Sequence, residues 1–499
     1  MPSKPTLPAA LYTAAQVREM DRLSIERYGI PGDALMQRAG QAAFNLIRSR
    51  WPEARKILVL TGTGNNGGDG FVVARLALQA GWRVTVMQLG DRERIAGDAQ
   101  TNALRYAALA GDWQTYTDEL PRDVDLIVDA VFGTGLEREV TGRWAQALKA
   151  MNRLPAPVLA LDIPSGLHSD TGRILGAAVR ADTTITYIGL KRGMFTADGP
   201  ACCGEIVFEA LEVPAQVYAS QILSARRLDW QRQKQLLQPR SRTDHKGKFG
   251  HVLVIGGDLG YGGAARLCAE SALRTGAGLV SLATRAEHVG AVLSARPEIM
   301  IHAVAEPDDL LQLLERATVV ALGPGLGCAD WGRSLWQALI DTELPLVADA
   351  DALNLLAESP RSHDNRVLTP HPGEAARLLG CTTEAIHADR FEAVEKLQQR
   401  YGGVAVLKGA GTLICDASNR PMAVCTDGNP GMASGGMGDV LTGVIAGFVA
   451  QGHDLSHAAE LAVCLHGAAA DKAARAGERG LLASDLMSHI RRLANPENE

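Results

Sequence analysis

The sequence predicts an α/β protein built from mostly parallel sheets that are covered by helices. Short apolar runs that end in Gly, Asp or Asn recur along the chain, and a stretch of helical periodicity follows each one. This alternation is typical of parallel strands joined by crossover helices. The pattern occurs in two series that a polar stretch separates, so we expect two α/β domains.

Length, composition and charge bound the class of protein. The chain has 499 residues, of which 46% are hydrophobic and 21% charged, which suits about two or three globular domains. A formal net charge of -6 is too mild to indicate a nucleic-acid surface. Eight cysteines are scattered without a Cys-x-x-Cys pair, so the sequence suggests neither a zinc site nor a disulfide framework.

The chain carries no pattern of secretion or of membrane insertion. The first residues contain prolines where a secretory signal would need an apolar run, and no uninterrupted apolar run reaches the ~18 residues of a membrane span. We therefore expect a cytoplasmic protein with no membrane partner and no nucleic-acid partner.

Ten predicted strands define the two series. The first series contains residues 56–60, 84–87, 126–129, 158–162 and 183–187, and the second contains residues 251–255, 318–322, 345–349, 366–369 and 404–407. The charged stretch 231–244 has little periodicity and suits an inter-domain connection. We place the domains at residues 1–225 and 226–499, and a single large sheet is the alternative. The motifs of the two halves differ, so no internal repeat is predicted.

A glycine-rich loop follows the first predicted strand. Residues 62–67 fit the pattern G-x-G-x-x-G between a strand and a helix. Glycines here let the backbone approach a phosphate, and the following helix presents free N–H groups. Asp91 lies further along, where a ribose-binding acid would be. The loop therefore favours dinucleotide binding, and a purely structural tight turn is the alternative.

Polar residues also follow two other strands of the first series. Asp129 and Asp162 end their strands, and Ser165 follows shortly after. Because the carboxyl ends of parallel strands share one edge of a sheet, these residues should face the same crevice as the glycine-rich loop. Asn66, Asp129 and Ser165 are candidate oxygen ligands of a hard cation, and Asp162 faces the ligand. Alternatively, Asp129 and Asp162 are helix caps or loop braces.

These motifs resemble those of the YjeF N-terminal family, the NAD(P)H-hydrate epimerases, over residues 11–215. The resemblance covers residues 12–21, the Gly-Asn-Asn-Gly-Gly-Asp-Gly loop, and residues 128–135 and 162–166. It implies a Rossmann-like three-layer domain, an isomerase that interconverts the two epimers of the hydrates NADHX and NADPHX.

The resemblance also implies a set of site residues. Asp162 would contact the hydrate and is our candidate acid/base, because exchange at a hemiaminal carbon requires proton transfer. Asn66, Asp129 and Ser165 would coordinate K⁺. The remaining hydrate-binding residues would be Asn65, Asn66, Gly67, Gly68, Asp69, Gly133, Thr134, Gly135, Leu136, Glu137, Arg138 and Glu139.

The most informative motif of the second series is a glycine-rich run that ends at Asp439 and leads into an apolar helix. Glycines at a helix N-terminus form an anion hole for phosphoryl oxygens, and Asp439 is placed to accept a proton from a hydroxyl beside it. This arrangement indicates phosphoryl transfer of the ribokinase kind. The alternative is that Asp439 only caps a glycine-rich turn.

Two more segments of the second series follow strands. Residues 408–412 form a candidate nucleotide-binding turn in which Lys408 meets a phosphate. His371 lies between two prolines at a strand end, a position that favours ligand contact, although a lone histidine is more often structural.

The segments 369–374, 408–412 and 428–439 closely resemble the ADP/ATP-dependent NAD(P)H-hydrate dehydratases, over roughly residues 225–495. The resemblance implies a ribokinase-like α/β domain, a lyase that uses ADP or ATP with Mg²⁺ to convert the S hydrate into NADH or NADPH. Ala265, Gly325, His371 and Asp439 would contact the hydrate. The nucleotide would contact Lys408, Gly409, Ala410, Gly411, Thr412 and Gly438.

Together the two implied activities complete one metabolite-repair task, because a dehydratase specific for one epimer leaves the other behind unless the two exchange. We also expect a homo-oligomer. Three other functions stay open at this point: a small-molecule kinase with an accessory domain, a non-catalytic N-terminal module that senses dinucleotides, and an NAD-dependent dehydrogenase.

Overall fold

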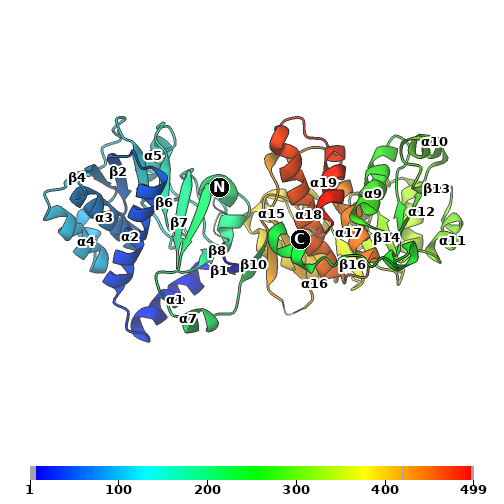
Figure 1. The fold of residues 1–499 in the computed structure, drawn as a ribbon, viewed down its shortest axis with the longest axis horizontal. Coiled ribbons are helices and arrows are strands. Elements are labelled where there is room, and N and C mark those ends of the chain that lie inside the picture. The colour runs from blue at the N-terminus through cyan, green and yellow to red at the C-terminus, as the bar shows by residue number, and fades with distance from the viewer. Residues whose placement is uncertain (1–6, 419, 496–499) are drawn as a thin grey trace. The chain divides into compact units, whose positions relative to one another are not determined.

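A computed structural model of the chain describes residues 7–418 and 420–495. The chain divides into two compact units, a first unit up to Arg226 and a second unit from Arg227 onward. Both are α/β structures with hydrophobic cores of their own, which confirms the predicted fold class (Figure 1). Within the described ranges, no helix is long and apolar enough to cross a membrane.

The sheet of the first unit has seven strands, and all of its neighbouring strands are parallel. Their order is β4-β3-β2-β5-β6-β7-β9, so the direction of winding reverses between β2 and β5. Loops at such a reversal diverge and leave a crevice, the usual ligand site of this architecture. The strands are β2 (Lys56–Thr61), β3 (Arg83–Gln88), β4 (Asp112–Thr115), β5 (Leu126–Ala130), β6 (Val158–Leu161), β7 (Thr183–Tyr187) and β9 (Glu205–Glu209).

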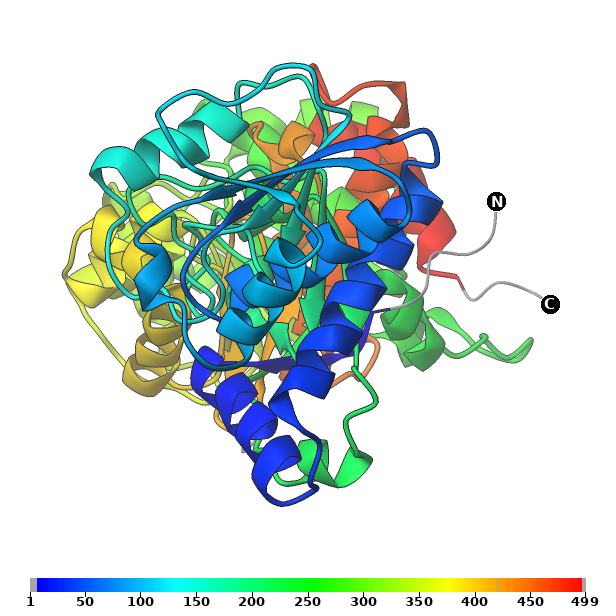
Figure 2. The ribbon, with the colours of Figure 1, turned by 90° about the vertical axis from the view of Figure 1, so that its left-hand side faces the viewer.

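Helices cover both faces of this sheet because alternate strand residues point to opposite sides. In β2, Ile57 and Val59 join the core beneath α1 (Ala14–Glu26), α2 (Gly32–Arg50), α3 (Asn65–Gln79), α4 (Gly97–Ala107) and α7 (Ala215–Ala219). Leu58 and Leu60 join the opposite core with α5 (Gly142–Met151). Figure 2 shows α1 and α2 of this unit in blue.

A small group of strands holds the start of the chain in place. β1 (Ala10–Tyr12) pairs in parallel with β8 (Leu190–Lys191) and antiparallel with β10 (Ala225–Leu228). Tyr12 is the register partner of Lys191, so this pairing fixes the backbone of that lysine. The short helices η2 (Arg192–Phe195) and α6 (Gly199–Cys203) follow β8.

The sheet of the second unit is also parallel with one reversal of winding, but it ends in two antiparallel strands. Its parallel strands have the order β13-β12-β11-β14-β15-β16-β17, with the reversal between β11 and β14, and β18 and β19 then add antiparallel. They are β11 (His251–Ile255), β12 (Leu279–Thr284), β13 (Met300–Ala303), β14 (Val319–Leu322), β15 (Leu346–Ala348), β16 (Arg366–Leu368), β17 (Val404–Leu407), β18 (Thr412–Asp416) and β19 (Met422–Cys425).

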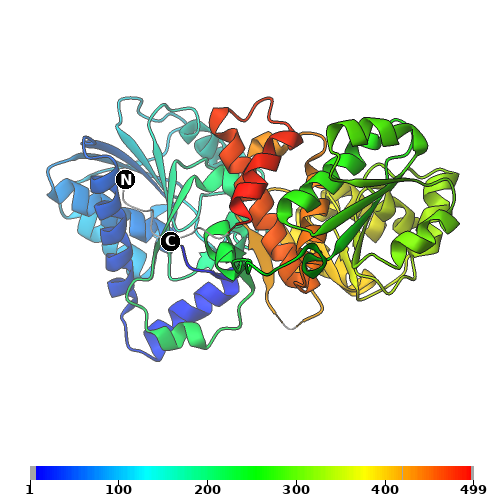
Figure 3. The ribbon, with the colours of Figure 1, turned by 45° about the vertical axis from the view of Figure 1, so that its right-hand side comes forward.

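Four helices form one large core of this unit with the sheet. They are α9 (Gly262–Thr275), α17 (Met437–Ala450), α18 (Leu455–Ala473) and α19 (Leu486–Leu493), and Figure 3 shows α9 in green beside the orange and red helices. The other helices are α8 (Trp230–Gln233), α10 (Ala286–Ala295), α11 (Leu311–Leu314), α12 (Asp330–Leu339), α13 (Asp351–Glu358), α14 (Pro372–Leu379), α15 (Thr383–Ala388) and α16 (Arg390–Tyr401).

All ten strands predicted from the sequence are present, each with ends within one residue of the prediction. The sequence missed β1, β4, β8, β9, β10, β12, β13, β18 and β19. Two expectations need correction. Residues 65–69 form the first turn of α3 rather than a loop. The polar stretch 231–244 belongs to the second unit, and its Leu237 joins the core of that unit.

Two helical glycines of the second unit give a matched test of the packing. A Cβ at Gly443 in α17 would lie 2.0 Å from the carbonyl oxygen of Cys268 in α9, whereas a Cβ at Gly290 in α10 would meet nothing within 4 Å. Gly443→Ala should therefore lower the free energy of unfolding by about 1–3 kcal/mol through overpacking. Gly290→Ala should raise it by about 0.4–1 kcal/mol. Urea unfolding of both variants measures this, and equal effects would contradict the close packing of α9 and α17.

Candidate functional site

A cavity of about 1010 Å³ opens in the first unit at the reversal between β2 and β5. Its lining includes Asn65, Asn66 and Asp69 of α3, residues 133–138 after β5, and Asp162 after β6. The predicted hydrate-binding segments therefore come together around one space, which is large enough for a dinucleotide. Asp91 also lines this cavity.

The glycines at the start of α3 pack against the backbone. A Cβ at Gly67 would lie 2.4 Å from the carbonyl oxygen of Gly62, and a Cβ at Gly68 would lie 2.6 Å from the sulfur of Met36. Neither glycine lines the cavity, and neither does Glu139. The close packing sets the start of α3, whose first-turn N–H groups have no partners within the helix and attract anions.

Oxygen atoms gather behind the cavity around Asp129 and Ser165. The two Asp129 carboxylate oxygens accept from the Ser165 hydroxyl at 2.6 Å and from its backbone N–H at 2.7 Å, and burial raises the pKa of Asp129 to about 6. Asn66 donates its amide N–H to the Phe132 carbonyl at 3.0 Å. Its side-chain oxygen is buried without a hydrogen-bond partner among the described residues. An orphaned amide oxygen beside a carboxylate and a hydroxyl fits a hard cation.

Asp162 and Lys191 form an ion pair at the cavity wall. The Lys191 ammonium is completely buried and contacts the Asp162 carboxylate, and it also donates to the Thr186 hydroxyl at 2.7 Å. Asp162 has φ +65°, in the left-handed region that side chains adopt with strain. The structure therefore holds Asp162 in a fixed orientation toward the cavity, and the sequence analysis did not identify Lys191.

Other ionisable groups surround this pair. Burial, then the negative charges of Asp162 and Asp21, raise the pKa of Asp69 well above its ordinary value. Burial and the same negative charge of Asp162 raise the pKa of Asp21. The Tyr187 hydroxyl is buried, with no hydrogen-bond partner in the described part of the chain. Asp162 thus lies near two carboxyl groups with raised pKa values, an arrangement suited to moving protons at a bound ligand.

The candidate site of the second unit is built at the N-terminus of α17. Gly436 precedes this helix with φ +89°, and Asp439 lies in its first turn. A Cβ at Gly438 would lie 3.1 Å from the Lys408 ammonium and 3.3 Å from an Asp349 carboxylate oxygen. Glycine thus lets the lysine reach the first turn of the helix, where free N–H groups and a cation together form an anion hole.

Lys408 is held by a buried ion pair with Asp349. Its ammonium lies 2.7 Å from one Asp349 oxygen, and the Thr442 hydroxyl donates to the other at 2.8 Å. Burial alone would raise the pKa of Asp349, but Lys408 and Thr442 outweigh it and hold that pKa below its usual value. The ammonium of Lys408 pairs with Asp349, and its contact with a nucleotide phosphate stays a prediction.

Two further carboxyl groups near Lys408 have raised pKa values. Burial, with the charge of Asp349, raises the pKa of Asp439 to about 6. Burial raises the pKa of Glu374 to about 7, and its carboxylate lies 3.8 Å from the Lys408 ammonium. His371 caps α14, and its Nε2 lies 3.4 Å from Glu374. At neutral pH Asp439 is therefore mostly a carboxylate that is still basic enough to accept a proton.

The remaining predicted contacts come from neighbouring loops. Asp258, after β11, donates its N–H to the carbonyl of Gly325, after β14, at 2.6 Å. Gly325 has φ +63°. Ala265 is buried in α9, one turn before Cys268, whose pKa is raised by burial and by Asp439. Ala265 and Asp439 thus lie on α9 and α17, two helices that pack together, and Gly325 lies on the loop after β14.

Several residues beside the two sites were missed by the sequence analysis. They are Asp21, Tyr187 and Lys191 in the first unit and Asp349, Glu374, Thr442 and His466 in the second. Asp349 and Glu374 lie inside motifs that follow strands, which is a usable signal. His466 lies in the middle of apolar α18, where burial and the charge of Lys408 lower its pKa to about 4. A single histidine in an apolar helix gives no such signal.

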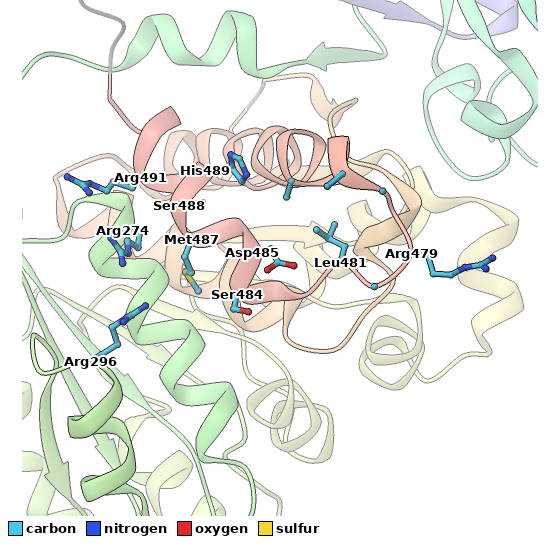
Figure 4. Close-up of a pocket in the computed structure, with 14 residues that line it drawn as sticks. Arg274, Arg296, Arg479, Leu481, Ser484, Asp485, Met487, Ser488, His489 and Arg491 are labelled. Carbon is cyan, nitrogen blue, oxygen red and sulfur yellow. The ribbon is translucent and has the colours of Figure 1, made fainter.

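A second hollow, of about 750 Å³, lies along α19 in the second unit and contains none of the predicted site residues (Figure 4). Arginines from separate segments line it, including Arg274, Arg296, Arg479 and Arg491. Arg296 is paired at 2.5 Å with the buried carboxylate of Glu270. Part of this positive charge is therefore already neutralised by the protein.

The fold and the two sites define an α/β enzyme that combines a Rossmann-like unit with a dinucleotide-sized cavity and a ribokinase-like unit with an anion hole. The family model of NAD(P)H-hydrate dehydratase matches residues 252–492, and that of the YjeF-related protein N-terminus matches residues 32–193. The chain belongs to the bifunctional NAD(P)H-hydrate repair enzymes. This membership confirms the family resemblance of both halves and disfavours the kinase, sensor and dehydrogenase alternatives.

Relatives of the whole chain support this assignment. The bifunctional NAD(P)H-hydrate repair enzyme of Coxiella burnetii is 50% identical over 97% of this chain and 99% of its own length. That of Escherichia coli is 44% identical over 99% of this chain and 95% of its own length. A solved ribokinase-like superfamily protein of Enterococcus faecalis is 28% identical, with a TM-score of 0.51, and covers 56% of this chain and 99% of that one.

The buried pair of Asp162 and Lys191 can be tested by a double-mutant cycle. Lys191→Met leaves a carboxylate without its cation and should cost about 3 kcal/mol of unfolding free energy. Asp162→Asn should cost much less when Lys191→Met is already present, which gives a coupling energy of about 2 kcal/mol in urea unfolding. The exposed pair of Lys56 and Asp123, at 2.7 Å, is the control and should couple by less than about 1 kcal/mol. Equal coupling energies in both pairs would contradict a buried ion pair between Asp162 and Lys191.

Proposed function

We propose that the first unit exchanges the R and S epimers of NADHX and NADPHX, and that the second unit dehydrates the S epimer to NADH or NADPH with ADP or ATP. The observation that carries this proposal is the place of Asp439, in the first turn of α17 beside the Lys408 ammonium. A base next to an anion hole suits the activation of a hydroxyl by phosphoryl transfer. The cavity around Asp162 in the same chain supplies a place for epimer exchange.

Epimer exchange requires protons to move at carbon 6 of the nicotinamide ring, which carries a hydroxyl group next to the ring nitrogen. Both routes, loss and return of water or opening and closing of the ring, begin with proton transfer. Asp162 takes the role of acid/base, and Lys191 keeps its carboxylate oriented. Asp69, whose pKa is raised well above its ordinary value by burial, is the proposed proton donor next to Asp162.

The oxygen cluster behind the cavity is the proposed K⁺ site. Asn66, Asp129 and Ser165 would hold the ion, and the unpartnered side-chain oxygen of Asn66 supports this assignment. A bound cation would supply positive charge beside the first turn of α3, where residues 65–69 and 133–139 are proposed to cradle the hydrate.

In the second unit, Asp439 accepts the proton of the carbon 6 hydroxyl while that oxygen attacks the terminal phosphoryl group of the nucleotide. ATP thereby becomes ADP, or ADP becomes AMP. The bond from carbon 6 to the phosphorylated oxygen then breaks, phosphate leaves, and a proton is lost from carbon 5 to restore the ring double bond. The helix N-terminus and Lys408 stabilise the charge on the phosphoryl oxygens. Ala265, Gly325 and His371 are proposed to contact the hydrate.

The nucleotide is proposed to occupy residues 408–412 and Gly438. No group of three carboxylate ligands lies beside Asp439 in residues 7–418 and 420–495, so Mg²⁺ would enter with the nucleotide phosphates rather than into a preformed cage. The small-molecule substrates and nucleotides are metabolites of the cytoplasm, where we place the protein. A homo-oligomer remains a prediction.

One assay tests both activities. A mixture of both hydrate epimers with Mg²⁺ and ADP or ATP should be converted completely to dihydronicotinamide, followed by its absorbance. Asp162→Asn should stop conversion after the S epimer is consumed, and Asp439→Asn should abolish dehydration while epimer exchange continues. Conversion of one epimer only by the wild-type protein would remove the epimerase assignment. A stable phosphorylated product without released phosphate would indicate a kinase instead.

The pKa of Asp439 sets the expected pH dependence of dehydration. A general base acts when it is unprotonated, and this pKa is raised to about 6. The kcat/KM of dehydration should therefore fall as the pH drops through about 6, tenfold per unit below it. Asp351 contributes to raising this pKa, so Asp351→Asn should move the acid limb to lower pH. Asp341 is exposed, so Asp341→Asn should leave the acid limb of the pH profile in place. An acid limb near pH 4 in the wild-type protein would contradict the role of Asp439 as general base.

A further inference from the structure

Arg390 is a buried cation next to the proposed nucleotide-binding turn. It is the first residue of α16, and only 2% of its surface is exposed. Burial lowers its pKa to about 10. A guanidinium in such a place is costly unless polar atoms surround it. Hydrogen-bond acceptors of the protein must therefore compensate this charge.

Backbone carbonyls around the turn 408–412 provide part of that compensation. The Nη2 of Arg390 donates to the carbonyl oxygens of Leu407 at 3.2 Å, Lys408 at 3.3 Å and Gly411 at 3.5 Å. All three are at the end of β17 or in the turn that follows it. One side chain thus ties both ends of the turn to the start of α16.

These contacts also orient the peptide groups of the turn. In a planar trans peptide the carbonyl and the following N–H point in opposite directions. A Lys408 carbonyl that faces Arg390 therefore directs the N–H of Gly409 to the other side. The Leu407 carbonyl does the same for the N–H of Lys408, which donates to the Pro370 carbonyl at 2.9 Å. The turn is thus anchored on both sides.

Gly409 fits closely against the guanidinium. It has φ +141°, and a Cβ at this position would lie 2.9 Å from Nη1 and 3.0 Å from Nη2 of Arg390. Any larger residue would displace either the arginine or the turn. The close contact with Arg390 therefore requires glycine at position 409, whether or not a ligand approaches the other side of the turn.

We propose that Arg390 is a positioning residue for the nucleotide: it holds the turn 408–412 in the shape that binds ADP or ATP, without touching the nucleotide itself. This inference rests on the proposed function, which places the nucleotide at that turn. Arg390 also places a positive charge on one side of the turn, and the polyphosphate of the nucleotide would lie on the other side. Its loss should weaken nucleotide binding more than it slows the chemical step.

Arg390→Met tests this role in the full chain. The KM for ADP or ATP should rise at least about tenfold, because the turn loses its charge-assisted hydrogen bonds, while kcat changes by less than about threefold. Arg390→Lys keeps the charge and one set of donors, so it should recover part of the affinity. Isothermal titration with ADP measures binding without turnover, and urea unfolding of the second unit reports whether the variant is still folded.

Arg366→Met is the matched control. Arg366 is an equally buried arginine of the same unit and donates to the Ile340 carbonyl. It begins β16, at the amino ends of the parallel strands, whereas the turn follows the carboxyl end of β17. This variant should lose stability but keep the wild-type KM for the nucleotide. Wild-type affinity for ADP in both Arg390 variants would overturn the positioning role. If the wild-type protein itself bound neither ADP nor ATP, the proposed function would fail first, and this inference with it.

Discussion

The second site depends on the buried ion pair between Lys408 and Asp349. Without the lysine, Asp349, Asp439 and Glu374 would place three carboxyl groups together with little solvent, which is unfavourable. With it, one carboxylate is fully ionised and the pKa values of the others are raised to about 6 and 7. Three motifs that are distant in sequence thus form one electrostatic unit, and the absence of a side chain at Gly438 lets the lysine reach the helix.

The first unit uses the same physical device with unrelated residues. Lys191 neutralises Asp162, while Asp21 and Asp69 have pKa values raised by burial and by the charge of Asp162. In both sites a single buried ammonium pairs with one carboxylate, while burial raises the pKa values of the neighbouring carboxyl groups. Raised pKa values suit acid/base chemistry, because such groups exchange protons more readily near neutral pH.

The sequence predicted the fold well because parallel strands buried on both faces are continuous apolar runs. It missed β4, because residues 112–115 are largely exposed and polar. It also missed the antiparallel β18 and β19, because no crossover helix separates them from the strand before. Glycine-rich motifs identified the loops of both sites. Lys191 could not be found in this way, because it lies outside the motifs and meets Asp162 only through tertiary packing. Asp21 lies in the segment 12–21, but α1 reaches the cavity through tertiary packing that the sequence does not show.

Separate hydrophobic cores in the two units have a genetic consequence. A lesion that unfolds one core leaves the other with its own packing, so a single amino-acid change need not remove both activities. Two defective alleles, one damaged in each half, would then restore the complete repair route when expressed in the same cell. Fusion in one polypeptide also fixes the two catalytic units at a one-to-one ratio, whatever the level of expression.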